Sequence, residues 1–365
     1  MIVLVNNVPL TADVVRGSIS VSLRPNGERS ASVSFYLVVP DIKDGDELEI
    51  FDGAQTTANK IFGGIINSYS AQMITPITEQ YPVYQIDVSS DGYGILAQRR
   101  IVNYTGTNMN ARDIFRDVFE ILTTETVFEG NFQSGPTLSN YVAKYKSIAE
   151  VFDDMANVSG YVWYIDNSRA LYFQPHWIGA SAPFELVEGG PFKDFHDLSW
   201  SGGLDNYANK VFVVGAGNIV AARENAAEIA DRASEADGQG TGVYGYVIED
   251  SNITSLSVAN NVADQHLLKS AVSPGNLSFS TYTKGFLPGH KLKVQIAAIT
   301  DMNNDPNVRP SVPNIWYYLI DEVTIEREND KVTKYNISAT RRYNSTFNTK
   351  TSNGFKEYFK NLVKK

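Results

Sequence analysis

The histidines are the first side chains to consider for metal binding or proton transfer, because imidazole serves both purposes near neutral pH. They are His176, His196, His266 and His290, and none stands at the close spacing of a metal-binding motif. We interpret His266 as a packed or surface residue on a helix, and His290 as a solvated residue in a turn before a strand. We therefore expect no metal site and no cofactor.

One stretch of alternating oxygen-bearing residues resembles the start of a calcium-binding loop. Asp301, Asn303 and Asp305 could converge on one hard cation. Pro306, however, stands where such a loop needs glycine, and Val312 stands where a bidentate glutamate would close it. An ordinary polar loop explains this segment better.

Paired carboxylates could serve glycoside hydrolysis, which uses two acidic side chains on either side of a glycosidic bond. Asp153 with Asp154, and Glu249 with Asp250, are such pairs. Neighbours in a sequence point in different directions on a helix or strand, so we expect these carboxylates to lie at the surface. No serine nucleophile motif or phosphate-binding loop occurs, and cysteine is absent. We therefore expect a protein that is not an enzyme.

The overall charge limits the partners. The formal net charge is -10 at pH 7, which disfavours tight binding to nucleic acid because such binding relies on Lys and Arg. An acidic surface would suit a conduit past which DNA slides, although ordinary solubility explains the same charge. No apolar run approaches the roughly 20 residues that cross a bilayer, so we expect no membrane span.

The elements that position these residues are mainly strands. Residues 1–99 alternate with period two between turn residues, which predicts a first antiparallel β-barrel domain. Ile19, Val21 and Leu23 share one face of a predicted strand, and Val33 and Phe35 lie on one face of the next. Aromatic and β-branched residues of this kind favour a pleated, half-buried surface.

Residues 100–180 show a change of period that predicts an α+β insert domain. Asn110 is placed to cap a helix that begins just after it. Ser147 and Glu150 form a capping box for a second helix, which Gly160 ends. A hairpin is then predicted over 161–165 and 170–174.

Residues 181–345 return to a strand pattern and predict a second β-barrel domain with helical insertions near 223–235 and 256–271. Residues 346–365 form a polar spacer and a short amphipathic helix with a C-terminal lysine cluster. This helix either folds back on the second barrel or docks on another subunit, and the second alternative makes its apolar face a candidate assembly interface. That face consists of Phe355, Tyr358, Phe359, Leu362 and Val363.

The two β regions repeat the same order of segments. Residues 45–50, 62–67 and 84–88 read GDELEI, FGGIIN and YQIDV, whereas residues 289–294, 318–323 and 335–339 read GHKLKV, YLIDEV and YNISA. A genuine duplication would give each chain two copies of one barrel. Three such chains would present six barrels and could mate with a six-fold ring.

At this point the sequence resembles the hub proteins of long-tailed bacteriophages, including the N-terminal region of tail-associated proteins. The resemblance covers roughly residues 1–343 in element order, and its segments are RPNGERSASV at 24–33, FGGI at 62–65, YVIEDSNI at 246–253 and TYTKGFLPG at 281–289. It implies two tube-like barrels per chain and a homotrimeric ring that joins the six-fold tail tube to a three-fold tip. The ring would surround a channel through which DNA passes without tight binding during genome ejection.

The same resemblance implies the protein's place and partners. We expect a virion component at the tail tip, assembled in the host cytoplasm and involved in host attachment. Its partners would be the tail tube, the distal tail or baseplate proteins, and a tip fibre or spike. Many relatives continue into a fibre or a wall-degrading domain, whereas this sequence ends soon after the second predicted barrel. The resemblance therefore does not extend to lytic activity.

Two other functions stay open from the residues alone. A cell-wall hydrolase would use some of the scattered carboxylates. A carbohydrate-binding module for the host surface would use exposed aromatic side chains such as Trp177 and Trp200.

Overall fold

The computed structural model describes residues 1–25, 28–39, 41–75, 81–175, 180–190, 194–202, 207–233, 240–251, 253–271, 275–296, 316–327 and 332–341. The predicted polar loop with Asp301, Asn303 and Asp305 lies outside these ranges, as does Trp177. The predicted C-terminal helix with Phe355, Tyr358, Phe359, Leu362 and Val363 also lies outside them. The expectation of a mainly β chain with an α+β insert is confirmed.

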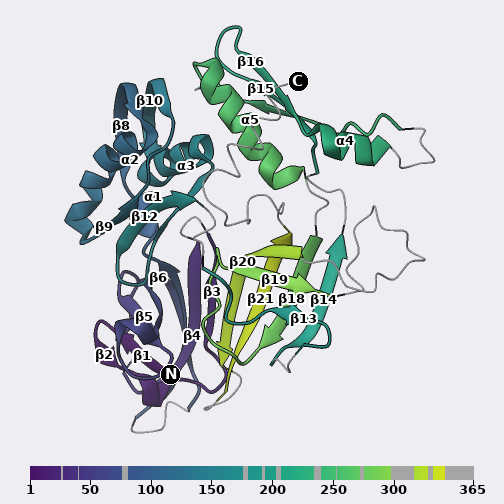
Figure 1. The fold of residues 1–365 in the computed structure, drawn as a ribbon. Coiled ribbons are helices and arrows are strands. Elements are labelled where there is room, and N and C mark those ends of the chain that lie inside the picture. The colour runs from purple at the N-terminus through teal and green to yellow at the C-terminus, as the bar shows by residue number, and fades with distance from the viewer. Residues whose placement is uncertain are drawn as a thin grey trace.

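A large sheet runs through the lower half of the molecule (Figure 1). The N-terminal part of the chain supplies one end of it, in the strand order β3-β4-β7-β6-β5-β1-β2. All neighbours in this part are antiparallel. The strands are β1 (Ile2–Val5), β2 (Val8–Pro9), β3 (Ser20–Leu23), β4 (Arg29–Leu37), β5 (Glu47–Phe51), β6 (Lys60–Met73) and β7 (Tyr84–Gly92), with short 3-10 helices at Thr11–Asp13 and Thr57–Asn59.

The C-terminal part supplies the other end, in the order β14-β18-β21-β20 with β19 beside β20. The two ends join where β20 pairs antiparallel with β3, near the middle of the sheet in Figure 1. The strands are β13 (Leu186–Val187), β14 (His196–Gly202), β18 (Gly275–Thr281), β19 (Lys291–Gln295), β20 (Trp316–Arg327) and β21 (Thr333–Arg341).

Two insertions form a helical layer above the sheet (Figure 1). The first contains α1 (Ile95–Gln98), β8 (Ile101–Asn110), α2 (Ala111–Phe119), a 3-10 helix (Glu120–Glu125), β9 (Phe128–Phe132), β10 (Thr137–Ser147), α3 (Ile148–Ser159), β11 (Tyr161–Ile165) and β12 (Ala170–Pro175). The second contains β15 (Lys210–Val214), β16 (Val220–Glu224), α4 (Ala226–Ala233), β17 (Gly245–Glu249) and α5 (Leu256–Ser270). None of the described helices is long and apolar enough to span a bilayer.

The predicted caps determine where the helices of the first insertion begin and end. The Asn110 side chain accepts a hydrogen bond from the Arg112 amide, which otherwise lacks a partner in the first turn. Ser147 and Glu150 form both bonds of the capping box, and Gly160 ends the helix in a left-handed conformation. These local predictions are confirmed because caps depend on residues within one turn.

Buried side chains form two clusters. One lies on one face of the large sheet and contains residues from both of its ends. The early and late β segments therefore share this core. The other lies in the helical layer, where the Phe115 ring stacks on Phe152 and Phe173 at centroid distances of 3.9 and 4.5 Å. Val211, Ile253 and residues of α5 belong to this second cluster, so the two insertions pack together although the 34 residues 176–209 separate them in the chain.

Candidate functional site

The carboxylates considered for hydrolysis make structural contacts. The Asp153 carboxylate accepts a hydrogen bond from the Trp163 indole at 2.7 Å. Asp154 accepts from the Tyr141 hydroxyl and the Lys146 ammonium, each at 2.6 Å. Both side chains are half-buried, so they are less solvated than predicted, and they connect α3 to neighbouring strands. Their short side chains can reach these donors because the strands pack directly on the helix.

The described histidines do not gather at one site. His266 stacks on the Tyr246 ring at 4.5 Å, and His196 lies 3.1 Å from Asp194. The prediction of a solvated His290 was wrong, because only 9% of its surface is exposed. Burial lowers the pKa of its imidazole, since a charged ring loses hydration there. Within the described ranges, no group of His, Asp and Glu could hold a metal ion.

The two β units, β1 to β7 and β13 to β21 without the second insertion, share individual backbone hydrogen bonds at equivalent positions. The Gly45 amide donates to the Ile66 carbonyl at 2.8 Å, and the Gly289 amide donates to the Ile320 carbonyl at the same distance. Both glycines have positive φ, 92° and 86°, a conformation that favours glycine. The same turn therefore precedes β5 in one unit and β19 in the other.

Strand registers repeat as well. β5 and β6 pair Glu47 with Ile65, and β19 and β20 pair Lys291 with Leu319. β6 carries a bulge between Ile66 and Ser68, and β20 carries one between Ile320 and Glu322. The order β5-β6-β7-β4-β3 therefore corresponds to β19-β20-β21-β18-β14.

The units differ where their outer strands begin. β1 pairs antiparallel with β5, whereas β13 pairs parallel with β19. The early and late parts of the chain nonetheless share one core topology, which confirms the repeated order of segments predicted from the sequence. The structure aligns Ile66 with Ile320 and Ser89 with Ser338, so the predicted matches of 62–67 with 318–323 and of 84–88 with 335–339 were two residues out of register.

One face of the shared sheet is polar. Residues directly paired across antiparallel strands point to the same face, and the pairs Ser22–Ser30, Ser32–Ser89 and Thr324–Ser22 follow one another across the join between the units. The opposite face carries the buried cluster. The polar face includes Ser20, Ser22, Ser30, Ser32, Ser34, Ser68, Ser70, Asp87, Ser89, Ser199, Ser201, Asn276, Ser278, Thr324, Asn336, Ser338 and Thr340.

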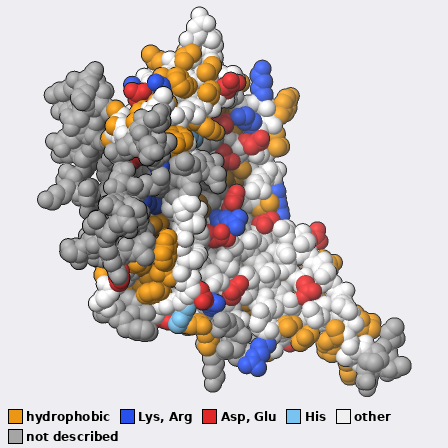
Figure 2. Space-filling model, turned by 90° about the vertical axis from the view of Figure 1, so that its right-hand side faces the viewer, with side chains coloured by type: hydrophobic (Ala, Val, Ile, Leu, Met, Phe, Trp, Pro, Cys, Tyr) orange, Lys and Arg blue, Asp and Glu red, His pale blue; other side chains and the backbone are white. Residues whose placement is uncertain are grey.

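Charges on this polar face are mainly acidic. Asp87, Asp91 and Glu326 lie on it, and Glu322 forms an ion pair with Arg24 at 2.9 Å. Lys334 is paired with Glu326 and lies on the same face. Hydrogen bonds, chiefly from Ser34, lower the pKa of the Asp87 carboxyl, which therefore stays ionised at neutral pH. Figure 2, viewed from the side of β14, likewise shows a broad area of uncharged polar side chains and backbone with scattered charges.

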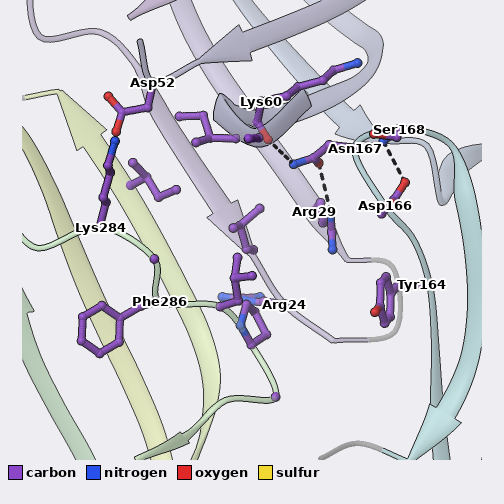
Figure 3. Close-up of a pocket in the computed structure, with 18 of the residues that line it drawn as sticks. Arg24, Arg29, Asp52, Lys60, Tyr164, Asp166, Asn167, Ser168, Lys284 and Phe286 are labelled. Carbon is purple, nitrogen blue, oxygen red and sulfur yellow. Dashed lines mark hydrogen bonds between the residues drawn. The ribbon is translucent and has the colours of Figure 1, made fainter. Parts of the chain in front are cut away.

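A cleft of about 620 Å³ lies where the two β units meet the first insertion (Figure 3). Arg29 donates to the Asn167 side chain at 3.0 Å, and Asn167 donates to the Lys60 carbonyl at 3.0 Å. The Tyr335 hydroxyl donates to Asp52 at 2.9 Å, which joins the second unit to the first. These contacts fix the relative positions of the three parts.

A second cluster holds the insertion to β5. Glu47 accepts hydrogen bonds from Tyr93 and from Arg169, whose Nη2 lies 3.1 Å from its Oε1. Burial acts to raise the pKa of the Glu47 carboxyl, but the hydrogen bonds and the Arg169 charge outweigh it and lower that pKa. Burial raises the pKa of the Tyr93 hydroxyl. Glu47 is thus a structural carboxylate that a shared turn places at the join.

The architecture defined by these two units matches solved tail proteins. The 43 kDa tail protein of prophage MuSo2 from Shewanella oneidensis superposes with a TM-score of 0.66, at 10% identity, over 93% of this chain and 97% of that one. The tail protein from Neisseria meningitidis MC58 gives 0.65 at 10% identity, over 93% and 95%. The resemblance to phage tail proteins is therefore confirmed at the level of the fold.

A related fold occurs outside phages. An E. coli protein described as a component of the type VI secretion system, with similarity to the T4 tail proteins gp27 and gp5, gives a TM-score of 0.55 at 11% identity. That superposition covers 93% of this chain and 76% of the other. No protein-family model matches the sequence, and no curated protein matches it.

Proposed function

We propose that this protein is a non-enzymatic structural hub of a bacteriophage tail tip, where three copies form a ring that joins the six-fold tail tube to a three-fold tip. The observation that carries the proposal is the duplicated β unit, with equal strand order, registers and bulges. Three chains with two equivalent units each present six similar faces, which is what a six-fold tube requires.

The polar face supports a channel for DNA. Serine, threonine and asparagine side chains on it offer hydrogen bonds without positive charge, and its carboxylates repel phosphates. Tight DNA binding depends on Lys and Arg contacts to phosphate, so such a wall lets DNA pass. In the proposed ring this face points to the axis.

The fold comparisons support the proposed partners and location. Two proteins of the same fold are described as tail proteins, and a third as a secretion component similar to phage gp27 and gp5. By this likeness we assign the tail tube, distal tail or baseplate proteins and a tip fibre or spike as partners, with the virion tail tip as the location. We also propose that the residues 355–363 face predicted from sequence docks on a neighbouring subunit.

The structural contacts of Asp153 and Asp154 favour a hub over a hydrolase. Both carboxylates hold α3 against its neighbouring strands through these hydrogen bonds.

Native mass spectrometry of the purified full chain, followed by electron microscopy along the ring axis, tests the proposal. The expected result is a trimer that shows six similar densities around a central hole. A chain that remains monomeric at high micromolar concentration would contradict it. A double exchange of Asp153→Asn and Asp154→Asn serves as the test of the alternative: peptidoglycan turnover by the wild type that this variant loses would indicate a hydrolase.

A further inference from the structure

Each β unit has an outer strand that could pair with a strand of another unit. Among the described residues, one such junction is formed, between β20 of the second unit and β3 of the first. The far half of β20 pairs with β3, matching Val323 with Leu23, Thr324 with Ser22, and Glu326 with Ser20. This junction is well buried, since Val323 is 0% and Leu23 is 2% exposed. It is the contact by which the second unit continues into the first.

The equivalent strands at the outer ends of the sheet have no such contact. By the repeat, β6 corresponds to β20 and β14 corresponds to β3. Among the described residues, the part of β6 beyond Ile66 pairs with β7 alone, and β14 pairs with β18 alone. Every side chain from Asn67 to Met73 is exposed, unlike the corresponding residues of β20.

We propose that β6 of one copy pairs antiparallel with β14 of the next copy, in the register of the internal β20–β3 junction. This inference rests on the proposed function and specifies the interface that builds the ring. The two shared bulges align Ser70 with Thr324. The pairings with β4 and β18 align Ser201 with Ser22.

The register that follows is specific. Tyr69 lies opposite Gly202 of the next copy, and Ser70 lies opposite Ser201. Ala71 lies opposite Trp200, and Gln72 lies opposite Ser199. Every pair therefore has the antiparallel spacing of the internal junction.

Side-chain sizes fit this register. Tyr69 and Trp200 are large and exposed in the single chain, at 47% and 45%. Their expected partners across the junction, Gly202 and Ala71, are small. A large aromatic ring opposite glycine or alanine fills the space that the small residue leaves, which is a recognised way to stabilise strand pairing.

These aromatic side chains also point to the correct face. Trp200 pairs with Leu277 on β18, and Tyr69 pairs with Val88 on β7. Both partners are buried in the cluster on one face of the large sheet, at 1% and 2% exposure. Because paired residues share a face, the two aromatic rings extend that cluster beyond the ends of the single chain. The interface would therefore continue the hydrophobic core from copy to copy.

The contact joins different surfaces of the two copies and so closes as a ring or extends as a filament. Repeating the internal junction at each interface gives every unit the same relation to its neighbour. Three chains then close a continuous barrel from β14, β18, β21, β20, β3, β4, β7 and β6 of each copy, in which the edges of β14 and of the far half of β6 are paired.

Disulfide trapping in the full chain tests the register, because the wild type contains no cysteine. The Arg327 amide donates to the Ile19 carbonyl, so the pair three residues along, Thr324 with Ser22, is a non-hydrogen-bonded pair. Its equivalent, Ser70 with Ser201, should bring the Cα atoms to about 4.5 Å, within disulfide range. We therefore combine Ser70→Cys with Ser201→Cys.

The matched control combines Ser68→Cys with Ser199→Cys, on the same strands and the same face. These positions lie four residues out of the proposed register, about 13 Å apart along the strand, which is too far for a disulfide. After mild oxidation, the first variant should run as a covalent trimer on a non-reducing gel, and the control should run as a monomer.

The remaining outcomes separate the two proposals. A trimer in native mass spectrometry without the Ser70–Ser201 cross-link, or with equal cross-linking in the control, overturns the register and leaves the hub standing. A chain that never trimerises overturns both. Ala71→Glu provides a second measurement: Ala71 is exposed in the single chain, so the variant should keep its circular dichroism spectrum and lose the trimer. A trimer that persists in this variant also counts against the interface.

Discussion

His290 and Asp46 occupy equivalent positions in the two β units. The Ile320 amide donates to the His290 carbonyl at 3.0 Å, and the Ile66 amide donates to the Asp46 carbonyl at 2.8 Å. The shared backbone bond explains why the turn is kept while the side chain changes. In the second unit the side chain is buried, and its Nδ1 has no hydrogen-bond partner. Folding therefore favours the neutral ring.

We predict that His290 makes the fold sensitive to mild acid. Its folded-state pKa is lowered by burial, so its contribution to stability is complete above the unfolded-state pKa of about 6.5 and is lost as the pH falls through the folded-state value. Thermal unfolding between about pH 7.5 and about pH 5 should show a larger fall in Tm for the wild type than for His290→Asn. Equal slopes for both proteins would refute this role of the imidazole.

At the scale of elements, the capping box on α3 decides where the best-packed helix of the insertion begins. Ser147 accepts from the Glu150 amide at 3.2 Å, and Glu150 accepts from the Ser147 amide at 2.6 Å. The helix carries Phe152 and Met155 into the core of the insertion, where both are 0% exposed. A weaker start of this helix therefore affects the whole layer.

Ser147→Ala should lower the free energy of unfolding by about 1 kcal/mol, because one first-turn amide loses its partner. Chemical denaturation of the full chain measures this change. Gln133→Ala, an exposed position just after β9, is the control and should change stability by less than about 0.5 kcal/mol. An unchanged midpoint for Ser147→Ala would show that other first-turn contacts suffice.

At the scale of the whole molecule, the two β units form one sheet, and the two insertions form one helical layer that bridges them. Asp52 ties the units through Tyr335, and Glu47 ties the first unit to the insertion through Arg169. The polar face continues across the β3–β20 join, where Thr324 pairs with Ser22. A ring of such chains would carry this face around its axis.

We predict that the low positive charge of the polar face limits DNA binding. Ser89→Lys combined with Ser338→Lys places lysines at equivalent exposed positions of the two units on that face. The affinity of the assembled protein for duplex DNA at low salt should rise by about tenfold, because each lysine can neutralise a phosphate. Fluorescence anisotropy with labelled duplexes measures it.

Thr107→Lys with Gln133→Lys is the control, because it adds the same charge at exposed positions on the insertion. Its affinity should rise clearly less than that of the polar-face variant. An equal rise for both variants would mean that net charge, and not the polar face, governs DNA binding.

Local features could be predicted from the residues alone. Asn110, Ser147, Glu150 and Gly160 act within one helical turn, so their caps could be predicted without knowledge of the rest of the chain. Alternating residues predicted most strands of the β units, and the repeated segments predicted that these units are alike. The division into domains at residues 99, 180 and 345 stays a prediction.

Features that depend on residues distant in the chain follow from the tertiary fold and could not be predicted. The burial of His290, the partners of Asp153 and Asp154, and the pairing of β3 with β20 all require elements whose positions no local pattern specifies. Trp200 shows the reason most clearly. Its exposure follows from its place on β14, which pairs only with β18 among the described residues. The alternation of side chains determines which face of a strand is buried, whereas the packing of the whole chain determines which strands pair.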